Sequence, residues 1–250
     1  MIILKNLFSN KIYVDAFCKE KFIVDAFPIS RMNKHIPEWF KQLPSEFYQN
    51  ANDGLNRYQS ATIKRCPGFV EFYKKGFTIP LWSDVTIASF VNPDEKRIGW
   101  AAHSPSSSAT LAHHHPNQLG PAFDNYFHLK FNSPWACREK TGVNFLLTSI
   151  SWSSIDLWDK IYTAQGILNF KHQPSTNINC FIHRKNYDFI LEAGTPMVGI
   201  FPLTEKEVEF KCHHISEEEW KKVHDGIAGS QYFFLGGYHK SKEFLGKNKK

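Results

Sequence analysis

The residues in this sequence best suited to chemistry are three consecutive histidines, His113, His114 and His115. Side chains two residues apart on a β-strand project from the same face, so His113 and His115 could bind one metal ion together. A third ligand must come from elsewhere, and His103 is the first candidate. This spacing is typical of cupin-like β-barrels, which hold iron, manganese or zinc. It predicts a divalent metal bound by His113, His115 and His103, with Asp84, His128 and His183 as alternative third ligands.

The flanks of the histidine run favour a different interpretation. Segments 104–108 and 116–121 are rich in Ser, Pro and Gly, which is typical of loops. A histidine run in a loop is more often a solvated or partner-facing patch than a metal site. The cupin signature also has a carboxylate a few residues later, where this chain has Asn117, Gln118 and Leu119. Both interpretations remain open.

No other motif identifies a catalytic or cofactor-binding residue. Cys212, His213 and His214 are consecutive, and consecutive residues seldom chelate one ion without a turn, so we expect the end of a strand there. The sequence has no Gly-rich phosphate loop, no Ser elbow and no HExxH. The enzyme question therefore stays open, and a divalent metal is the one cofactor that the sequence indicates.

Composition indicates one β-rich globular domain. A length of 250 residues suits a single sandwich or barrel. Aromatic residues make up 15% of the chain, and aromatic side chains favour strands and large buried cores. We expect a mainly β fold, either an antiparallel sandwich or a jelly-roll/cupin-like barrel, with short helices near the N- and C-terminal ends.

Charge and cysteine usage limit the partners and the compartment. The net charge of +6 is concentrated in lysines at the C-terminal end, without the Arg–aromatic–Gly pattern of many nucleic-acid binders, so nucleic acid is not a favoured partner. The five cysteines are scattered and form no CxxC, which indicates a reducing, cytoplasmic compartment. No secretory signal and no apolar run of about 20 residues is present, so we expect no membrane association.

Periodicity and turn signals predict many short strands between the two ends of the chain. Period-two patterns or short apolar runs predict strands over 12–17, 22–27, 77–81, 85–91, 97–102, 126–131, 136–138, 145–151, 166–169, 179–182, 189–191, 197–202 and 207–212. Pro37 and Pro44 bracket one predicted helical turn, and Pro67 and Gly76 bracket a second predicted helix. Segment 45–61 is predicted to be an exposed loop.

The chain is expected to form one structural domain with three parts. Residues 1–76 would supply strands and short helices packed on the core, 77–214 the β-rich core, and 215–250 a C-terminal helix and basic tail. Ser216 and Glu219 have the spacing of a capping box at the start of that last helix.

Ordered segments along most of the chain resemble a family of tailed-phage and bacterial proteins for which no activity is known. The matching segments are IPEWFKQLP at 36–44, TIKRCP at 62–67, GFTIPL at 76–81, NSPW at 132–135 and GTP at 194–196. The chain departs from the family at 139–144, where the family has a Thr-Pro-Pro-Gly-Tyr-Ser-like step. The resemblance implies a phage or environmental bacterial origin and transfers no activity. Segment 192–202 is also similar, over about ten residues, to the turn and strand that close β-clip barrels of dUTPases and dCTP deaminases.

Three functions are compatible with these features. The first is a phage-associated β-rich module that binds a ligand or partner, located in the host cytoplasm or the virion, with a homo-oligomer or a virion protein as candidate partner. The second is a metal-dependent cupin-like enzyme, such as an oxygenase, that uses His113 and His115. The third is a β-clip enzyme that handles nucleotides.

Overall fold

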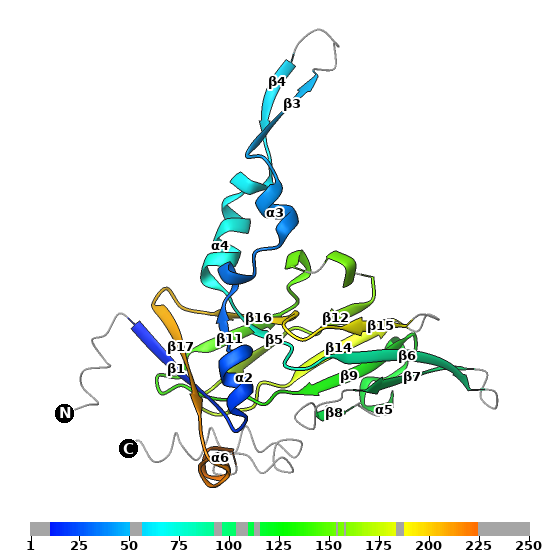
Figure 1. Cartoon of the computed structure of the whole chain (residues 1–250), viewed down its shortest axis with the longest axis vertical. Coiled ribbons are helices and arrows are strands. Elements are labelled where there is room, and N and C mark those ends of the chain that lie inside the picture. The colour runs from blue at the N-terminus through cyan, green and yellow to red at the C-terminus, as the bar shows by residue number, and fades with distance from the viewer. Residues whose placement is uncertain are drawn as a thin grey trace.

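The computed structural model of the chain is mainly β, with short helices, as the sequence predicts (Figure 1). It describes residues 11–50, 57–92, 97–103, 110–112, 116–153, 155–157, 159–183 and 188–224. Their strands form five sheets, and four of these sheets contribute to one buried core. This arrangement is consistent with a β-sandwich.

A five-stranded antiparallel sheet lies at the centre of that core, in the order β13-β11-β16-β5-β2. Its strands are β13 (Gly166–Asn169), β11 (Asn144–Thr148), β16 (Pro196–Pro202), β5 (Phe77–Pro80) and β2 (Ser30–Arg31). All four residues of β5 are buried, as expected for a strand covered on both faces. Gly194, with φ of +87°, makes the turn before β16, and its N–H donates to the Leu81 carbonyl at 2.7 Å.

The first described strand pairs with the last. β1 (Lys11–Cys18) lies between β10 (Ala136–Arg138) and β17 (Glu207–His214). The β1–β17 pair is parallel along its full length, whereas the sequence interpretation expected antiparallel sheets. Alternate residues of β1 are fully or almost fully buried: Ile12, Val14, Ala16 and Cys18. The N-terminal strand is therefore part of the core rather than an addition to it.

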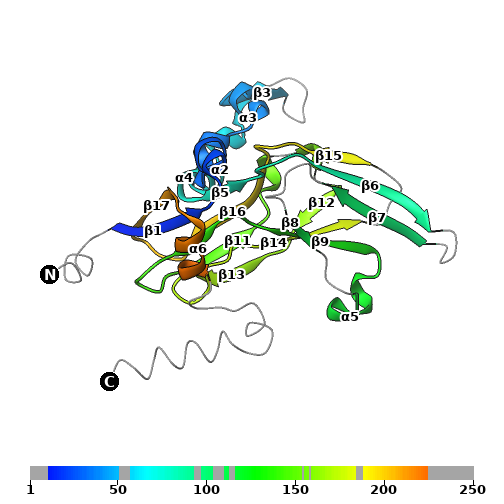
Figure 2. The ribbon, with the colours of Figure 1, turned by 60° about the horizontal axis from the view of Figure 1, so that its bottom comes forward.

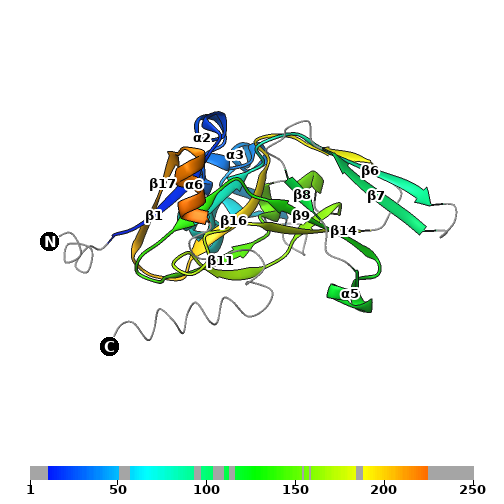
Figure 3. The ribbon, with the colours of Figure 1, turned by 90° about the horizontal axis from the view of Figure 1, so that it is seen from below.

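Two further sheets complete the body. One has the order β12-β14-β9-β8, and the other has the order β15-β6-β7. Their strands are β12 (Ile161–Thr163), β14 (Ile178–His183), β9 (Tyr126–Asn132), β8 (Thr110–Ala112), β15 (Phe189–Leu191), β6 (Val85–Asn92) and β7 (Arg97–His103). The β6–β7 ribbon and the β1–β17 pair lie at opposite ends of the body (Figures 2 and 3).

A stalk of short helices carries a two-stranded hairpin away from the sheets (Figure 1). The stalk consists of α3 (Glu38–Gln42) and α4 (Pro67–Lys75) with the 3₁₀ turns Met32–His35 and Ile63–Arg65, and the hairpin consists of β3 (Glu46–Asn50) and β4 (Arg57–Ala61). A small second core, built on Met32, Phe69, Tyr73 and Ile150, holds the stalk to the body. The Phe40 and Phe69 rings stack at 4.4 Å.

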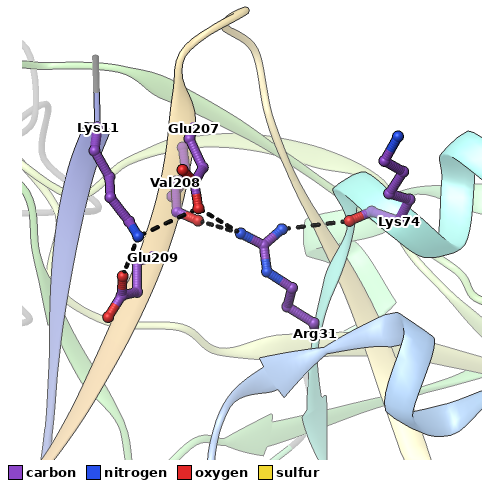
Figure 4. Close-up of polar contacts among 6 residues, drawn as sticks. All are labelled: Lys11, Arg31, Lys74, Glu207, Val208 and Glu209. Atoms are coloured by element: carbon purple, nitrogen blue, oxygen red, sulfur yellow. Dashed lines mark hydrogen bonds and ion pairs between the residues drawn. The ribbon is translucent and has the colours of Figure 1, made fainter.

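The base of the stalk is closely packed against the body. A Cβ on Gly76 would lie 2.5 Å from the Met32 sulfur and 2.7 Å from the Phe201 ring, so a larger residue there would force these side chains to shift. Arg31, in β2 of the central sheet, donates to α4 of the stalk and to β17, as Figure 4 shows. Beside it, the Glu209 and Glu207 carboxylates accept from Lys11 and raise the pKa of that amine above its ordinary value.

Two local predictions from the sequence need correction, and a third is confirmed. Segment 22–27 is not a strand, because α2 (Lys21–Ala26) forms there with Ile23 buried and a Lys21–Asp25 ion pair across one turn. Segment 45–61 is not a loop, because its described residues form the β3–β4 hairpin. The helix at the C-terminal side is confirmed as α6 (Glu217–His224), with Ser216 and Glu219 in a reciprocal capping box. Among the described residues, no helix is long and apolar enough to cross a membrane.

Candidate ligand-binding pocket

The outer face of the β12-β14-β9-β8 sheet carries an unusual set of aromatic side chains. In β14, Ile178, Cys180 and Ile182 are buried in the core, so the alternating residues Phe181 and His183 project from the opposite face. In β12, the Thr163 hydroxyl donates inward to the Met197 carbonyl at 2.9 Å, which leaves Tyr162 on that same outer face. The inward alternation of apolar residues thus determines which rings face outward.

Strand register brings these rings together. Phe181 lies directly opposite Tyr162 on one side and His128 on the other, and His183 lies opposite Tyr126. Residues opposite each other in antiparallel strands have Cβ atoms about 4.5–5.5 Å apart, so each row forms side-chain contacts. The Tyr126 and His183 rings meet edge to face at 5.2 Å, and so do the His128 and Phe181 rings at 5.2 Å.

A short turn before β9 extends this surface. The 3₁₀ turn Pro121–Phe123 follows α5 (Pro116–Leu119) and Gly120, whose φ of +77° suits glycine. Phe123 from this turn stacks on Phe181 with ring centroids 4.9 Å apart.

The surface is hollowed into a pocket of about 510 Å³. This volume falls within the range of about 300–1,000 Å³ that is typical of small-molecule sites. The pocket is lined by Phe123, Tyr126, Asp159, Lys160, Ile161, Tyr162, Ala164, Gln165, Phe181 and His183. Tyr162, Tyr126 and Phe123 remain 47%, 38% and 37% exposed, so part of each side chain borders the open space of the pocket.

Polar groups lie among the rings, and two of them lack a hydrogen-bond or ion-pair partner among the described residues. The Nδ1 atom of His183 is buried and has no hydrogen-bond partner. Such a group costs about 1–3 kcal/mol when it stays unpaired, and native structures contain few of them. The Asp159 carboxylate is exposed and forms no ion pair among the described residues.

The other two polar residues of the pocket already have contacts. Gln165 donates from Nε2 to the Thr148 hydroxyl at 3.2 Å, which leaves its Oε1 atom as an acceptor. The Lys160 ammonium lies 6.0 Å from the centre of the Phe189 ring, at the limit of a cation–π contact. The pocket therefore combines stacking surfaces with a carboxylate, an ammonium group and an amide oxygen.

The structure does not test the proposed metal ligands His113 and His115, which lie outside the described residues. His103 is the last residue of β7, opposite Thr86 in β6. No group of three or more His, Cys, Asp or Glu residues in the described part of the chain could hold a metal ion. The metal site thus stays a prediction.

Of the alternative third ligands, two belong to the pocket sheet and one has a structural role. His128 and His183 lie on the outer face of β9 and β14. Asp84 lies elsewhere, and its carboxylate accepts from the Ala193 N–H at 2.8 Å, next to the Gly194 turn.

The Cys212–His214 segment ends β17, as the sequence predicts, and α6 follows shortly after it. The Cys212 thiol donates to the Ile29 carbonyl, whereas His213 on the other side of the strand hydrogen-bonds to Asp15 at 2.9 Å. These two residues therefore face different surroundings and do not form one ligand set.

Sequence reasoning missed the pocket, although it named His183 as a candidate ligand. The available signal was the alternation of Asn179, Phe181 and His183 with buried residues, together with Tyr126 and His128 in β9. A search for family models finds none that matches the chain, and no curated protein sequence matches it either.

Proposed function

We propose that this chain is a binding module whose pocket on the outer face of β12, β14 and β9 takes a small ligand that contains a ring. The observation that carries the proposal is a pocket of about 510 Å³ that is lined by the rings of Phe123, Tyr126, Tyr162 and Phe181 together with Asp159 and Gln165. The ring of a ligand would cover Tyr162 and Tyr126, and its polar edge would meet the Asp159 and Gln165 side chains.

The energetics of the exposed rings support a binding role. Aromatic side chains contribute large contact areas at a low cost in side-chain entropy, because only two torsions become fixed. Three of the pocket rings keep more than a third of their surface in water, although the inner face of the same sheet is almost fully buried. The association with tailed phages forms part of this proposal, and it is supported by the resemblance of the segments described above.

Ligand-observed NMR on the full chain tests the proposal. Saturation-transfer difference spectra would be recorded with a mixed panel of saccharides, nucleosides, choline and indole, first with the wild-type protein and then with Tyr162→Ala. The matched control is Tyr48→Ala, which removes an exposed tyrosine from the hairpin.

We expect at least one compound class to give a signal that Tyr162→Ala abolishes and Tyr48→Ala preserves. If every signal is the same in both variants, the pocket does not bind these ligands and the proposal is wrong.

A further inference from the structure

We infer that the hairpin β3–β4 carries a second binding surface, which takes single-stranded nucleic acid. The hairpin stands at the far end of the stalk, clear of the sheets of the body (Figure 1). None of its side chains whose exposure is described is buried. A two-stranded hairpin without a buried face is at best marginally stable in water, so the apolar side chains here do not form a core within the hairpin. They remain open to a partner.

One face of the hairpin carries two exposed rings, one from each strand. Strand register places Phe47 opposite Ser60 and Tyr58 opposite Gln49, so these four side chains share a face. The Gln49 Nε2 atom donates to the Ser60 hydroxyl at 2.7 Å along one diagonal. Phe47 and Tyr58 occupy the other diagonal, which spans about 7–8 Å. Their side chains are 43% and 49% exposed.

Two rings on one face suit the bases of a single strand. Each base has an aromatic face, and stacking on protein rings contributes to the affinity for single strands of any sequence. Bases in a duplex already stack on their neighbours, so they are not available to Phe47 and Tyr58. The Gln49 amide and the Ser60 hydroxyl beside the rings add polar groups that can meet base edges.

Positive charge surrounds this face. Residues 32–76, which form the stalk and the hairpin, contain seven Lys and Arg residues against four Asp and Glu residues. At the far end of the hairpin, Arg57 is exposed and forms no ion pair among the described residues. At the near end, the Lys64 ammonium donates to the Lys41 and Leu43 carbonyls at 3.0 Å, which leaves one of its three N–H groups for a phosphate. A phosphate backbone has the complementary charge.

The opposite face of the hairpin is less suited to nucleic acid, although its Tyr48 is 71% exposed. Glu46, the only acidic residue of the two strands, lies on that face, two residues from Tyr48. Its carboxylate accepts from Gln59 and pairs with Arg65. That face thus offers one ring and a cation that is already paired, whereas the face with Phe47 has two rings and no acidic group.

Other partners fit this surface less well. An acidic peptide would pair with the cations and leave both rings in water. A membrane surface would take up the far end of the hairpin, where Asn50 and Arg57 lie opposite each other and would lose their hydration. A second copy of this chain carries the same net charge of +6. Nucleic acid was not favoured from the sequence, because a loop over 45–61 gives these rings and cations no common surface.

Fluorescence anisotropy with the full chain tests the inference. The probes are labelled oligothymidylate and oligouridylate, a DNA duplex of the same length and an oligoglutamate peptide. Both single strands should bind, and the duplex and the peptide should bind at least about tenfold more weakly, because neither offers unstacked bases. With one phosphate each on Arg57 and Lys64, a rise in salt concentration of about fourfold should weaken single-strand binding about sevenfold.

Matched substitutions assign the binding to one face. Phe47→Ala and Tyr58→Ala should each weaken single-strand binding about fivefold or more, the loss expected for one stacked base. Tyr58→Phe retains the ring, and Tyr48→Ala on the opposite face is the control, so both should keep binding within about twofold. Arg57→Gln should reduce the slope of log affinity against log salt by about 0.7, whereas Lys140→Gln on the body should not. Thermal unfolding of each variant checks that it is folded.

Each alternative result would overturn the inference. No binding of either single strand would do so, as would binding that survives both Phe47→Ala and Tyr58→Ala. Equally tight binding of the duplex would assign the affinity to charge alone, and equally tight binding of the peptide would assign the surface to an acidic protein. An effect of Tyr48→Ala as large as that of Tyr58→Ala would show that the binding does not belong to this face. None of these results bears on the pocket, whose test depends on Tyr162.

Discussion

Arg31 donates from Nη2 to the main-chain carbonyl of Val208 at 2.9 Å and joins two segments that are 177 residues apart in the sequence (Figure 4). Its Nη1 atom donates to the Lys74 carbonyl at the end of α4, at 3.3 Å. The guanidinium also lies 4.8 Å from the centre of the Phe77 ring. One planar group therefore fixes the stalk, the central sheet and β17 to one another.

Substitution of Arg31 by lysine should lower the free energy of unfolding by about 1–2 kcal/mol, because lysine has no planar guanidinium group that spans the two carbonyls while it stacks on Phe77. Urea unfolding followed by circular dichroism measures this change. Arg57→Lys on the exposed hairpin is the matched control and should change the stability by less than about 0.5 kcal/mol. Equal effects of the two variants would contradict the role of Arg31.

Gly76→Ala should destabilise the protein by about 1–3 kcal/mol through overpacking, because the added methyl would overlap Met32 and Phe201. A calorimetric melting curve should show a lower midpoint, by about 2–4 °C per kcal/mol. Gly166→Ala serves as the control, since a Cβ at Gly166 would meet no atom within 4 Å. An unchanged midpoint for Gly76→Ala would show that the junction can relax.

Glu139→Gln should cost about 2–4 kcal/mol of stability. The Glu139 carboxylate is 3% exposed and accepts from the N–H groups of Thr141, Gly142 and Val143 and from the Thr141 hydroxyl. Glutamine keeps one oxygen but directs an NH₂ group at these donors, so some of them lose their acceptor. Chemical denaturation of this variant should be compared with that of Glu205→Gln, whose side chain is 97% exposed. A loss below about 0.5 kcal/mol would refute the prediction.

Thiol reactivity should distinguish Cys66 from the other four cysteines. Burial raises the pKa of Cys18 and Cys180 to about 12 and of Cys212 to about 11, and it also raises the pKa of Cys137. These thiols stay protonated at pH 8 and react slowly, whereas Cys66 is exposed. Titration with Ellman's reagent should find one fast thiol in the native protein and none in Cys66→Ser. Two or more fast thiols in the native protein would disprove the burial argument.

The same thiols make stability depend on pH in the alkaline range. Their folded pKa values lie above the ordinary value of 9, so the folded protein binds more protons than the unfolded chain above that pH. Their contribution to stability is therefore complete below pH 9 and decreases as the pH rises toward 11–12. Urea midpoints measured from pH 8 to pH 10.5 should fall with pH, and a rise would contradict the assignment.

Most of the core strands could be predicted from local patterns, and the exceptions have physical causes. Gly166–Asn169 and Phe189–Leu191 match the expected bounds, because turn residues flank short apolar runs. α2 was mistaken for a strand because its β-branched and aromatic residues favour strands, whereas tertiary packing of Ile23 and the Lys21–Asp25 pair support a helix. The polar hairpin β3–β4 lacks the apolar alternation that a half-buried strand shows, so the sequence indicated a loop.

Less of the candidate site than of the fold can be predicted from the sequence. Phe181 and His183 could be placed on one face of a strand, but their neighbours Tyr162 and Tyr126 come from strands whose pairing the sequence does not reveal. β12 was not predicted, although the three-residue strands β10 and β15 were. A pocket built across three strands requires the register of each pair, and register depends on contacts between distant segments.

The parallel pairing of β1 with β17 has a consequence for synthesis on the ribosome. Lys11 pairs with Glu207, about 200 residues later in the chain. At roughly 5–20 residues per second, β1 waits about 10–40 s before its partner strand is made. During that interval β1, with its apolar residues Ile12 and Val14, has no β17 beside it to complete the sheet. Completion of this sheet thus waits for the synthesis of β17, and chaperones that bind nascent apolar segments have β1 as an early target.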